Sequence, residues 1–331
     1  MTVIRNRNFS LPDHYSSALI QFDEVVVGGP DAIQFISNFI TADINGLKEN
    51  KGCDAFFCDA RGWILDIAFV LRNNDKIRVF VARGRGQDIA GHLSRYHIRE
   101  NLTIHQTQEK LHSVLMSGGA ESWLEKYFEI SIPINLYQQF SEKADGNLFS
   151  TRTTSATLMA VDWISPSNFL LMVPEERKSV LEDSLKANAL RNVTDEIITY
   201  ARLQQGWPLA SDIPEKTLPQ EVGLHERTIS FTKGCYLGQE TVARLDALGH
   251  VNRRLVVLEV EQGELVVVGD SVASRGDFVS HVTSVGYFRK YDSALVMAVI
   301  PIKSLDSEGN LTVAGRRATV VSSTFLDTLA T

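Results

Sequence analysis

The residues best suited to chemistry lie together in the stretch Lys233-Gly234-Cys235-Tyr236-Leu237-Gly238-Gln239-Glu240. Cys235 supplies a thiol, whose ionised form is both a nucleophile and a metal ligand. The charge of Lys233 and the positive end of a helix predicted just downstream would each lower the pKa of this thiol. We therefore expect Cys235 to act and Lys233 to assist it. The structural alternative is a half-buried cysteine in a tight turn.

The other residues of the stretch predict its backbone. Gly234 and Gly238 leave the chain free to turn sharply, and we expect both to require a positive φ. A helix follows through residues 241–245, on which Glu240 and Arg244 stand four residues apart, the spacing of neighbours on one face. Tyr236 and Gln239 complete the motif.

The stretch resembles the signature of the YgfZ family, folate-binding proteins tied to iron–sulfur cluster maintenance and tRNA modification. The resemblance extends to Arg202-Leu203-Gln204-Gln205-Gly206-Trp207-Pro208 and Pro219-Gln220-Glu221, which are similar to further segments of that family. It implies tetrahydrofolate as the bound cofactor. It also implies iron–sulfur enzymes or assembly proteins, including tRNA-modifying enzymes, as partners.

The same resemblance implies a set of folate contacts. The aromatic ring of Phe22 would stack on the pterin, and Asp43 would accept a hydrogen bond from a pterin N–H. Arg61 would bind the carboxylates of the glutamate tail. The family pattern places a second aromatic ring near Ile198, where this chain is aliphatic. Residues nearby that could take part are Tyr200, Trp207 and Arg227. Each contact has an alternative without a ligand. Phe22 could be a core residue, Asp43 a polar residue at a helix end, and Arg61 a solvated arginine.

Composition limits the class of protein. With 33 Lys and Arg against 40 Asp and Glu, the formal charge of -7 argues against strong direct nucleic-acid binding, although residues 61–100 are locally basic. No stretch reaches the length of a membrane span, and three cysteines fit a reducing compartment, so we expect a cytoplasmic protein. Cys53 and Cys58, on opposite faces of a predicted strand, are expected to be structural, and no metal site is expected.

The hydrophobic patterns predict an α+β fold. A strand, a helix, three strands and a helix are expected first between residues 22 and 96 and again between 113 and 190. We therefore expect two ferredoxin-like α+β units, about 16–106 and 107–248, forming a folate-binding body. Short strands after residue 252, including one at 265–268, predict a small β-barrel-like domain over 249–331. Its stretch 282–286 is similar to the C-terminal domain of the aminomethyltransferase of glycine cleavage.

Two other functions stay open at this point. One is a folate-dependent aminomethyltransferase that moves a one-carbon unit to tetrahydrofolate, and the other is a module that senses folate without chemistry. Cys235 favours the YgfZ-like protein over the transferase, whose matching segment generally lacks this cysteine. Whether the chain is an enzyme is left open, as is the reaction of the thiol, which could attack a one-carbon group or handle a sulfur or cluster species.

Overall fold

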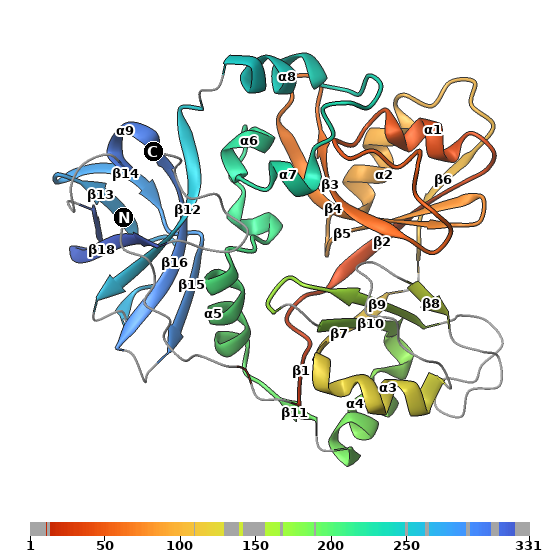
Figure 1. The fold of residues 1–331 in the computed structure, drawn as a ribbon, viewed down its shortest axis with the longest axis horizontal. Helices are drawn as coiled ribbons and strands as arrows, with labels where there is room; N and C mark the ends of the chain where they lie inside the picture. The colour runs from red at the N-terminus through yellow and green to blue at the C-terminus, as the bar shows by residue number, and fades with distance from the viewer. Residues whose placement is uncertain are drawn as a thin grey trace.

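The computed structural model describes residues 11, 14–108, 110–128, 139–141, 156–165, 168–188, 190–248, 251–261, 265–288, 292–305 and 311–321. Its strands form three sheets, and each sheet gathers strands from a different part of the chain (Figure 1). The expected α+β class is confirmed.

The first sheet belongs to the N-terminal part of the chain. Its elements are β2 (Phe22–Gly28), α1 (Ala32–Ser37), β3 (Gly52–Cys58), β4 (Ile64–Asn73), β5 (Lys76–Ala82), α2 (Gly86–Ser94) and β6 (Thr103–Gln106). The strand order is β3-β4-β5-β2-β6. Apolar residues of α1 and α2, such as Ile36 and Leu93, pack with Val25 and Val79 on one face of this sheet. The other face, with Phe69 and Phe80, packs against the second α+β unit, which is described next.

The second unit repeats this order of elements. It consists of β7 (Leu111–Ser117), η1 (Gly118–Ala120), α3 (Glu121–Phe128), β8 (Gln139–Ser141), β9 (Thr157–Val161), β10 (Asn168–Pro174), η2 (Glu175–Arg177), α4 (Lys178–Ala187) and β11 (Arg191–Asn192). Its sheet runs β11-β1-β7-β10-β9-β8, which is the first sheet's order with one strand inserted. That strand, β1 (Tyr15–Ser17), comes from the start of the described chain and pairs in parallel with β11. The recurrence predicted from the sequence is therefore present in the topology.

The third sheet is built from the C-terminal part of the chain. Helices α5 (Asp195–Gln205), η3 (Ala210–Asp212), α6 (Pro219–Val222), α7 (His225–Thr228) and α8 (Gln239–Leu248) lead to it. Its elements are β12 (Arg253–Glu261), β13 (Ser271–Ser274), β14 (Asp277–His281), β15 (Ser284–Phe288), β16 (Ser293–Pro301), α9 (Ile302–Leu305), β17 (Leu311–Val313) and β18 (Arg316–Val321). The order is β14-β13-β17-β18-β12-β16-β15, and β14 also contacts β16. This contact means that the sheet curls, as expected for a barrel-like domain.

Two expected elements differ in the structure. Residues 265–268 are not a strand, because the backbone turns there: Asp270 N donates to Val267 O, and Asp270 Oδ2 accepts from Val267 N at 2.9 Å. The helix expected over 175–190 is shorter, since η2 precedes it and α4 ends at Ala187. No helix in the described part of the chain is both long enough and apolar enough to cross a membrane.

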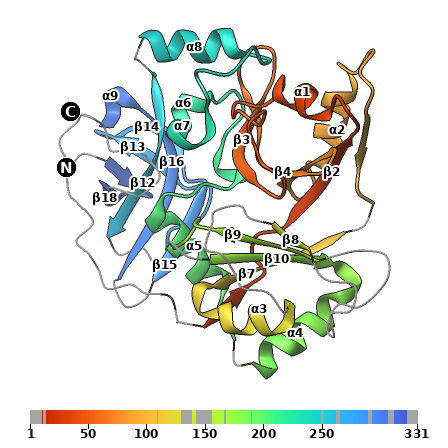
Figure 2. The ribbon, with the colours of Figure 1, turned by 45° about the vertical axis from the view of Figure 1, so that its right-hand side comes forward.

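One hydrophobic cluster joins all three sheets. It contains Phe69 from the first sheet, Leu170 from the second and Leu255 from the third, together with Ile198 and Leu203 of α5. The helices α3 and α4 cover the far side of the second sheet, so the two α+β units meet through their open faces (Figure 2). The candidate site lies at this junction.

Candidate functional site

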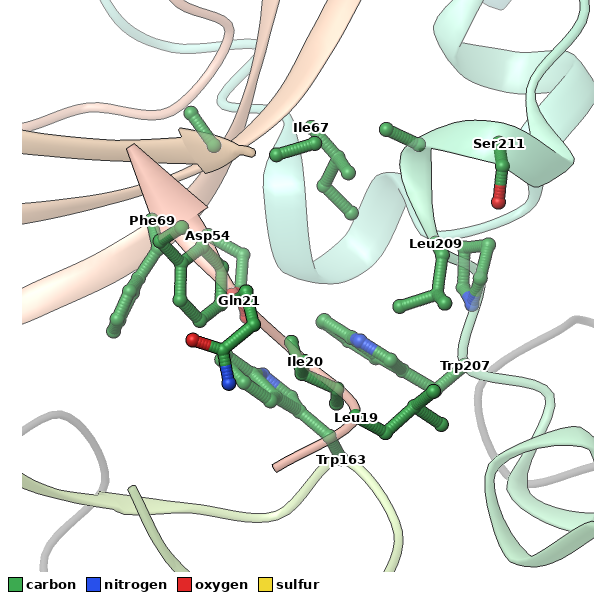
Figure 3. A pocket seen from close by; sticks show the side chains of 15 residues that line it. Leu19, Ile20, Gln21, Asp54, Ile67, Phe69, Trp163, Trp207, Leu209 and Ser211 are labelled. Atoms are coloured by element: carbon green, nitrogen blue, oxygen red, sulfur yellow. The ribbon is translucent and has the colours of Figure 1, made fainter. Parts of the chain in front are cut away.

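An apolar pocket of about 190 Å³ opens at the edge of the shared cluster. Figure 3 shows its walls, which come from the segment before β2, from β4, from the loop after β9 and from the segment after α5. The lining residues are Leu19, Ile20, Gln21, Phe22, Asp54, Ile67, Ala68, Phe69, Ala82, Trp163, Trp207, Pro208, Leu209, Ala210 and Ser211. Both α+β units and the connecting segment therefore build the pocket.

Aromatic rings give the pocket its shape. The indoles of Trp163 and Trp207 stack with centroids 5.5 Å apart and an interplanar angle of 14°. Phe22 and Phe69 lie 6.0 and 5.6 Å from Trp163. Flat faces of this kind favour a planar ligand, which gains both apolar burial and ring contacts.

A buried carboxyl group is the main polar feature of the wall. Asp54 of β3 is 1% exposed and accepts a hydrogen bond from Arg227 Nε. Arg227, on α7, also donates from Nη1 to Asp162 at 2.9 Å, and its guanidinium lies 5.0 Å from the Trp207 ring centroid. The ion pair thus ties β3 to α7 and to the loop after β9 at the back of the pocket.

Burial raises the pKa of Asp54 to about 7. The charge of Arg227 opposes this rise, and the neighbouring Asp162 carboxyl adds to it. A carboxyl group with such a pKa exchanges its proton near neutral pH. It can therefore accept a hydrogen bond from a ring N–H of a ligand or carry a proton to and from it.

The structure brings together three of the expected folate-binding residues. Phe22 and Trp207 line the pocket, and Arg227 lies against Trp207. Asp43, Arg61 and Tyr200 are not among the lining residues.

The side chains of these other three residues face elsewhere. Asp43 is exposed and accepts a hydrogen bond from Asn45 N at 3.0 Å. Arg61 is exposed, with its guanidinium 4.9 Å from the Trp63 ring centroid. Tyr200 is 3% exposed in the shared core. Their expected folate contacts stay predictions, and this pocket provides none of them.

Of the lining residues, sequence reasoning named only Phe22 and Trp207 as ligand contacts. Among those it missed, Asp54, Phe69 and Trp163 matter most for the chemistry of the wall. A usable signal existed for Asp54, since an aspartate beside Ala55-Phe56-Phe57 is a charged residue inside an apolar strand, which requires a partner or a function. No comparable signal marks Trp163, because its stacking partner Trp207 is distant in the sequence.

The cysteine of the signature stretch is exposed and is not among the pocket-lining residues. Lys233, by contrast, is 8% exposed, and its ammonium donates to three carbonyl oxygens: that of Ser37, the last residue of α1, at 2.7 Å, and those of Ile40 at 2.9 Å and Ala42 at 2.7 Å in the segment that follows. An ammonium has three protons, so these acceptors use all of them. Lys233 therefore anchors the loop to α1.

Burial lowers the pKa of Lys233 to about 8, and the negative charge of Asp43 opposes this shift.

The two glycines of the loop have different roles. Gly238 has φ +81°, and a Cβ there would lie 2.5 Å from Asp59 O in the turn between β3 and β4. The loop is therefore packed directly on that turn. Gly234 has no positive φ, and a Cβ there would meet nothing within 4 Å. The expectation of a positive φ at Gly234 was wrong, because the turn is made at Gly238.

The remaining motif residues begin and support α8. Tyr236 is 7% exposed and packs with Ile229 and Val242, while Gln239 Oε1 lies 3.3 Å from Tyr236 N. Glu240 and Arg244 are exposed on α8.

The other two cysteines lie on β3, with Cys58 buried in the shared core and Cys53 half-buried on the opposite face. Burial raises the pKa of both thiols, that of Cys53 to about 12. Within the described ranges, no three His, Cys, Asp or Glu residues are grouped to hold a metal ion.

Comparison with known proteins places this geometry in context. No model of a protein family matches the chain. It is 23% identical over 281 residues to the tRNA-modifying protein YgfZ of Colwellia psychrerythraea, covering 82% of each chain. It is 25% identical over 257 residues to the protein of that name from Shigella dysenteriae, covering 75% of this chain and 73% of the other.

A solved structure shows the same fold. The glycine cleavage system aminomethyltransferase T of Bartonella henselae superposes with a TM-score of 0.78 at 18% identity, covering 95% of this chain and 86% of that one. The resemblance expected from the signature stretch is thereby confirmed: the chain is a relative of the tRNA-modifying proteins named YgfZ and has the fold of the glycine-cleavage aminomethyltransferase.

Proposed function

We propose that this chain is a folate-binding protein of the YgfZ type that supports iron–sulfur enzymes, including those that modify tRNA. Tetrahydrofolate would occupy the aromatic pocket, and Cys235 would be the residue on which activity depends. The relatives named tRNA-modifying protein YgfZ support the link to tRNA modification.

The observation that carries the proposal is the combination of flat aromatic walls with a buried carboxyl group. The pyrimidine ring of a reduced pterin is planar and presents N–H donors at its edge, so it would lie against Trp207 and Phe22 while Asp54 accepts a hydrogen bond. A pocket of about 190 Å³ is smaller than the roughly 300 Å³ at which sites for drug-sized ligands begin. The ring would therefore be enclosed and the glutamate tail would lie outside. Bound tetrahydrofolate would supply a nitrogen carrier for a one-carbon unit.

Calorimetric titration with tetrahydrofolate tests the pocket. We expect binding together with an increase in melting temperature, because a ligand of the native state stabilises it by mass action. Trp207→Phe, which keeps a ring but reduces the stacking area, should weaken binding severalfold. Trp63→Phe, outside the pocket, is the matched control and should bind as wild type. The absence of both heat and thermal stabilisation at millimolar ligand would refute the folate proposal.

The thiol is tested separately from the pocket. Because Cys235 is exposed while burial raises the pKa of Cys53 to about 12, iodoacetamide between pH 5 and 9 should label Cys235 first. Peptide mapping identifies the labelled cysteine. In a strain lacking the gene, Cys235→Ser should fail to restore tRNA thiolation and iron–sulfur enzyme activities, since serine lacks a soft sulfur. Full restoration would show that the loop acts without its thiol.

A second candidate function is aminomethyl transfer, and the Asp54 carboxyl is the observation that favours it. A group with a pKa of about 7 in the pocket can exchange a proton with a bound one-carbon carrier. A turnover assay with an aminomethylated carrier and tetrahydrofolate distinguishes an enzyme from an accessory protein. Turnover that Asp54→Asn abolishes even at saturating tetrahydrofolate would establish the transferase, because saturation separates lost proton transfer from weakened binding.

A further inference from the structure

The segment Arg202–Pro208 contains a motif that the pocket chemistry does not explain. Arg202 is 2% exposed, and Asp212, at the end of η3, is 0% exposed. Their ion pair has an N–O distance of 2.9 Å. Between these two residues runs the segment Trp207–Ser211, which forms one wall of the pocket (Figure 3).

The ion pair holds this wall by its backbone. Arg202 Nη1 donates to Trp207 O at 3.0 Å, and Leu209 N donates to Asp212 Oδ2 at 2.8 Å. Together with the backbone bonds from Trp207 N to Arg202 O and from Asp212 N to Leu209 O, these bonds help to fix the backbone that carries the Trp207 indole and the Leu209 side chain.

The third sheet completes the network from the other side. Arg202 Nη2 donates to Ser284 Oγ, on β15. Thr283 Oγ1 lies 2.9 Å from Asp212 Oδ1 and 3.0 Å from Met297 O. Neither Thr283 nor Ser284 lines the pocket. Two hydroxyl groups of the C-terminal sheet thus contact both charges of a buried pair whose other partners are backbone atoms of the pocket wall.

We infer that Thr283 and Ser284 are positioning residues through which the C-terminal sheet sets the geometry of the pocket. A buried charge that loses a hydrogen-bond partner shifts to recover one, and here the shift would move the bonded wall. The C-terminal sheet is then required for ligand affinity although none of its residues lines the pocket. The ligand readout rests on the proposed folate function, whereas the ordering of the wall does not.

The test compares Ser284→Ala and Thr283→Val with Ser293→Ala. Ser293 is a matched control, because it is also a buried hydroxyl of the same sheet, 4% exposed, and donates to Glu259 at 3.0 Å far from the wall. All three variants should lose some stability. Only Ser284→Ala and Thr283→Val should bind tetrahydrofolate about tenfold more weakly. This is the loss of affinity expected when one hydrogen bond to a charged group is removed. Thr283→Ser keeps the hydroxyl and should bind as wild type.

Hydrogen exchange of the peptide spanning residues 207–212 provides a readout without ligand. It should be faster than wild type in Ser284→Ala and Thr283→Val, and unchanged in Ser293→Ala and Thr283→Ser. If wild type binds no tetrahydrofolate but this pattern holds, the folate proposal fails and the positioning role stands. Wild-type affinity and wild-type exchange in Ser284→Ala and Thr283→Val would overturn the inference.

Discussion

At the scale of single residues, Lys233, which was expected to assist the thiol, joins two distant segments of the backbone. Lys233 was expected to lower the pKa of Cys235, but its ammonium is buried and donates to three carbonyl oxygens beyond and at the end of α1. The end of a helix leaves carbonyl groups without partners inside the helix, and Lys233 satisfies that of Ser37 together with two carbonyls of the segment after α1.

Lys233→Ala should therefore destabilise the protein. Loss of a buried ammonium with its acceptors left unpaired should lower the free energy of unfolding by about 2 to 4 kcal/mol. Denaturant unfolding measures this, with Lys186→Ala as the control, since Lys186 is 72% exposed on α4. Wild-type stability in Lys233→Ala would contradict the anchoring role. It would favour the alternative role, in which Lys233 lowers the pKa of Cys235.

A second residue-scale prediction concerns Asp54 and Asp66, both buried carboxyl groups whose pKa burial raises from 3.8 to about 7. The folded state keeps their protons where the unfolded chain has lost them. The contribution of these two groups to the free energy of unfolding should therefore fall as the pH rises from about 4 to about 7. Asp54→Asn and Asp66→Asn should each reduce this decline, as measured by denaturant unfolding at several pH values.

The two variants should differ toward the ligand. Asp66 lies on β4 and does not line the pocket, so only Asp54→Asn should alter tetrahydrofolate affinity. An identical decline with pH in wild type and both variants would show that neither carboxyl group titrates in this window.

At the scale of elements, the loop before α8 is specified by its contact with the turn between β3 and β4. Gly62 and Gly238 both have positive φ and face each other, and a Cβ at Gly62 would lie 3.1 Å from Gly238 O. Close backbone approach, more than the thiol, explains the glycine at position 238.

Gly238→Ala and Gly234→Ala should consequently behave differently. At Gly238 a methyl group would combine an unfavourable φ with a 2.5 Å clash against Asp59 O, whereas at Gly234 it would enter open space. We expect a marked loss of melting temperature in the first variant and little change in the second. Equal melting temperatures would mean that the loop packs differently from this structure.

At the scale of the whole molecule, the three sheets share one hydrophobic cluster and one buried polar network. Residues 253–321 supply Leu255, Val257, Leu295 and Met297 to the cluster, and α5 lies between them and the two α+β units (Figure 1). The C-terminal sheet therefore shares a hydrophobic core with the two α+β units.

Removing the chain after residue 248 should prevent native folding of the remainder. The truncation would expose the apolar residues of α5 and leave Arg202 and Asp212 without Ser284 and Thr283. We expect loss of a cooperative melting transition and increased binding of a hydrophobic dye. A cooperative transition with unchanged tetrahydrofolate affinity would show instead that residues 1–248 fold independently.

The sequence by itself determined the local features of this protein. The alternation of apolar residues located most strands and helices, and the two strand-helix-strand patterns predicted two similar α+β units, since periodicity and turn residues are local signals. The signature stretch indicated the relatives. What sequence could not supply was the inserted β1, the true partner of Lys233, and the pocket itself.

Only the tertiary structure decided those points, because each depends on residues far apart in the chain. The pocket joins Phe22, Asp54, Trp163 and Trp207 from four segments, and the same packing leaves Asp43 and Arg61 exposed outside it. Lys233 donates to carbonyl oxygens of Ser37 and of the segment after α1, because a buried polar group without a partner is more costly than an exposed one. Local chemistry thus predicted which residues could act, and long-range packing determined which of them meet.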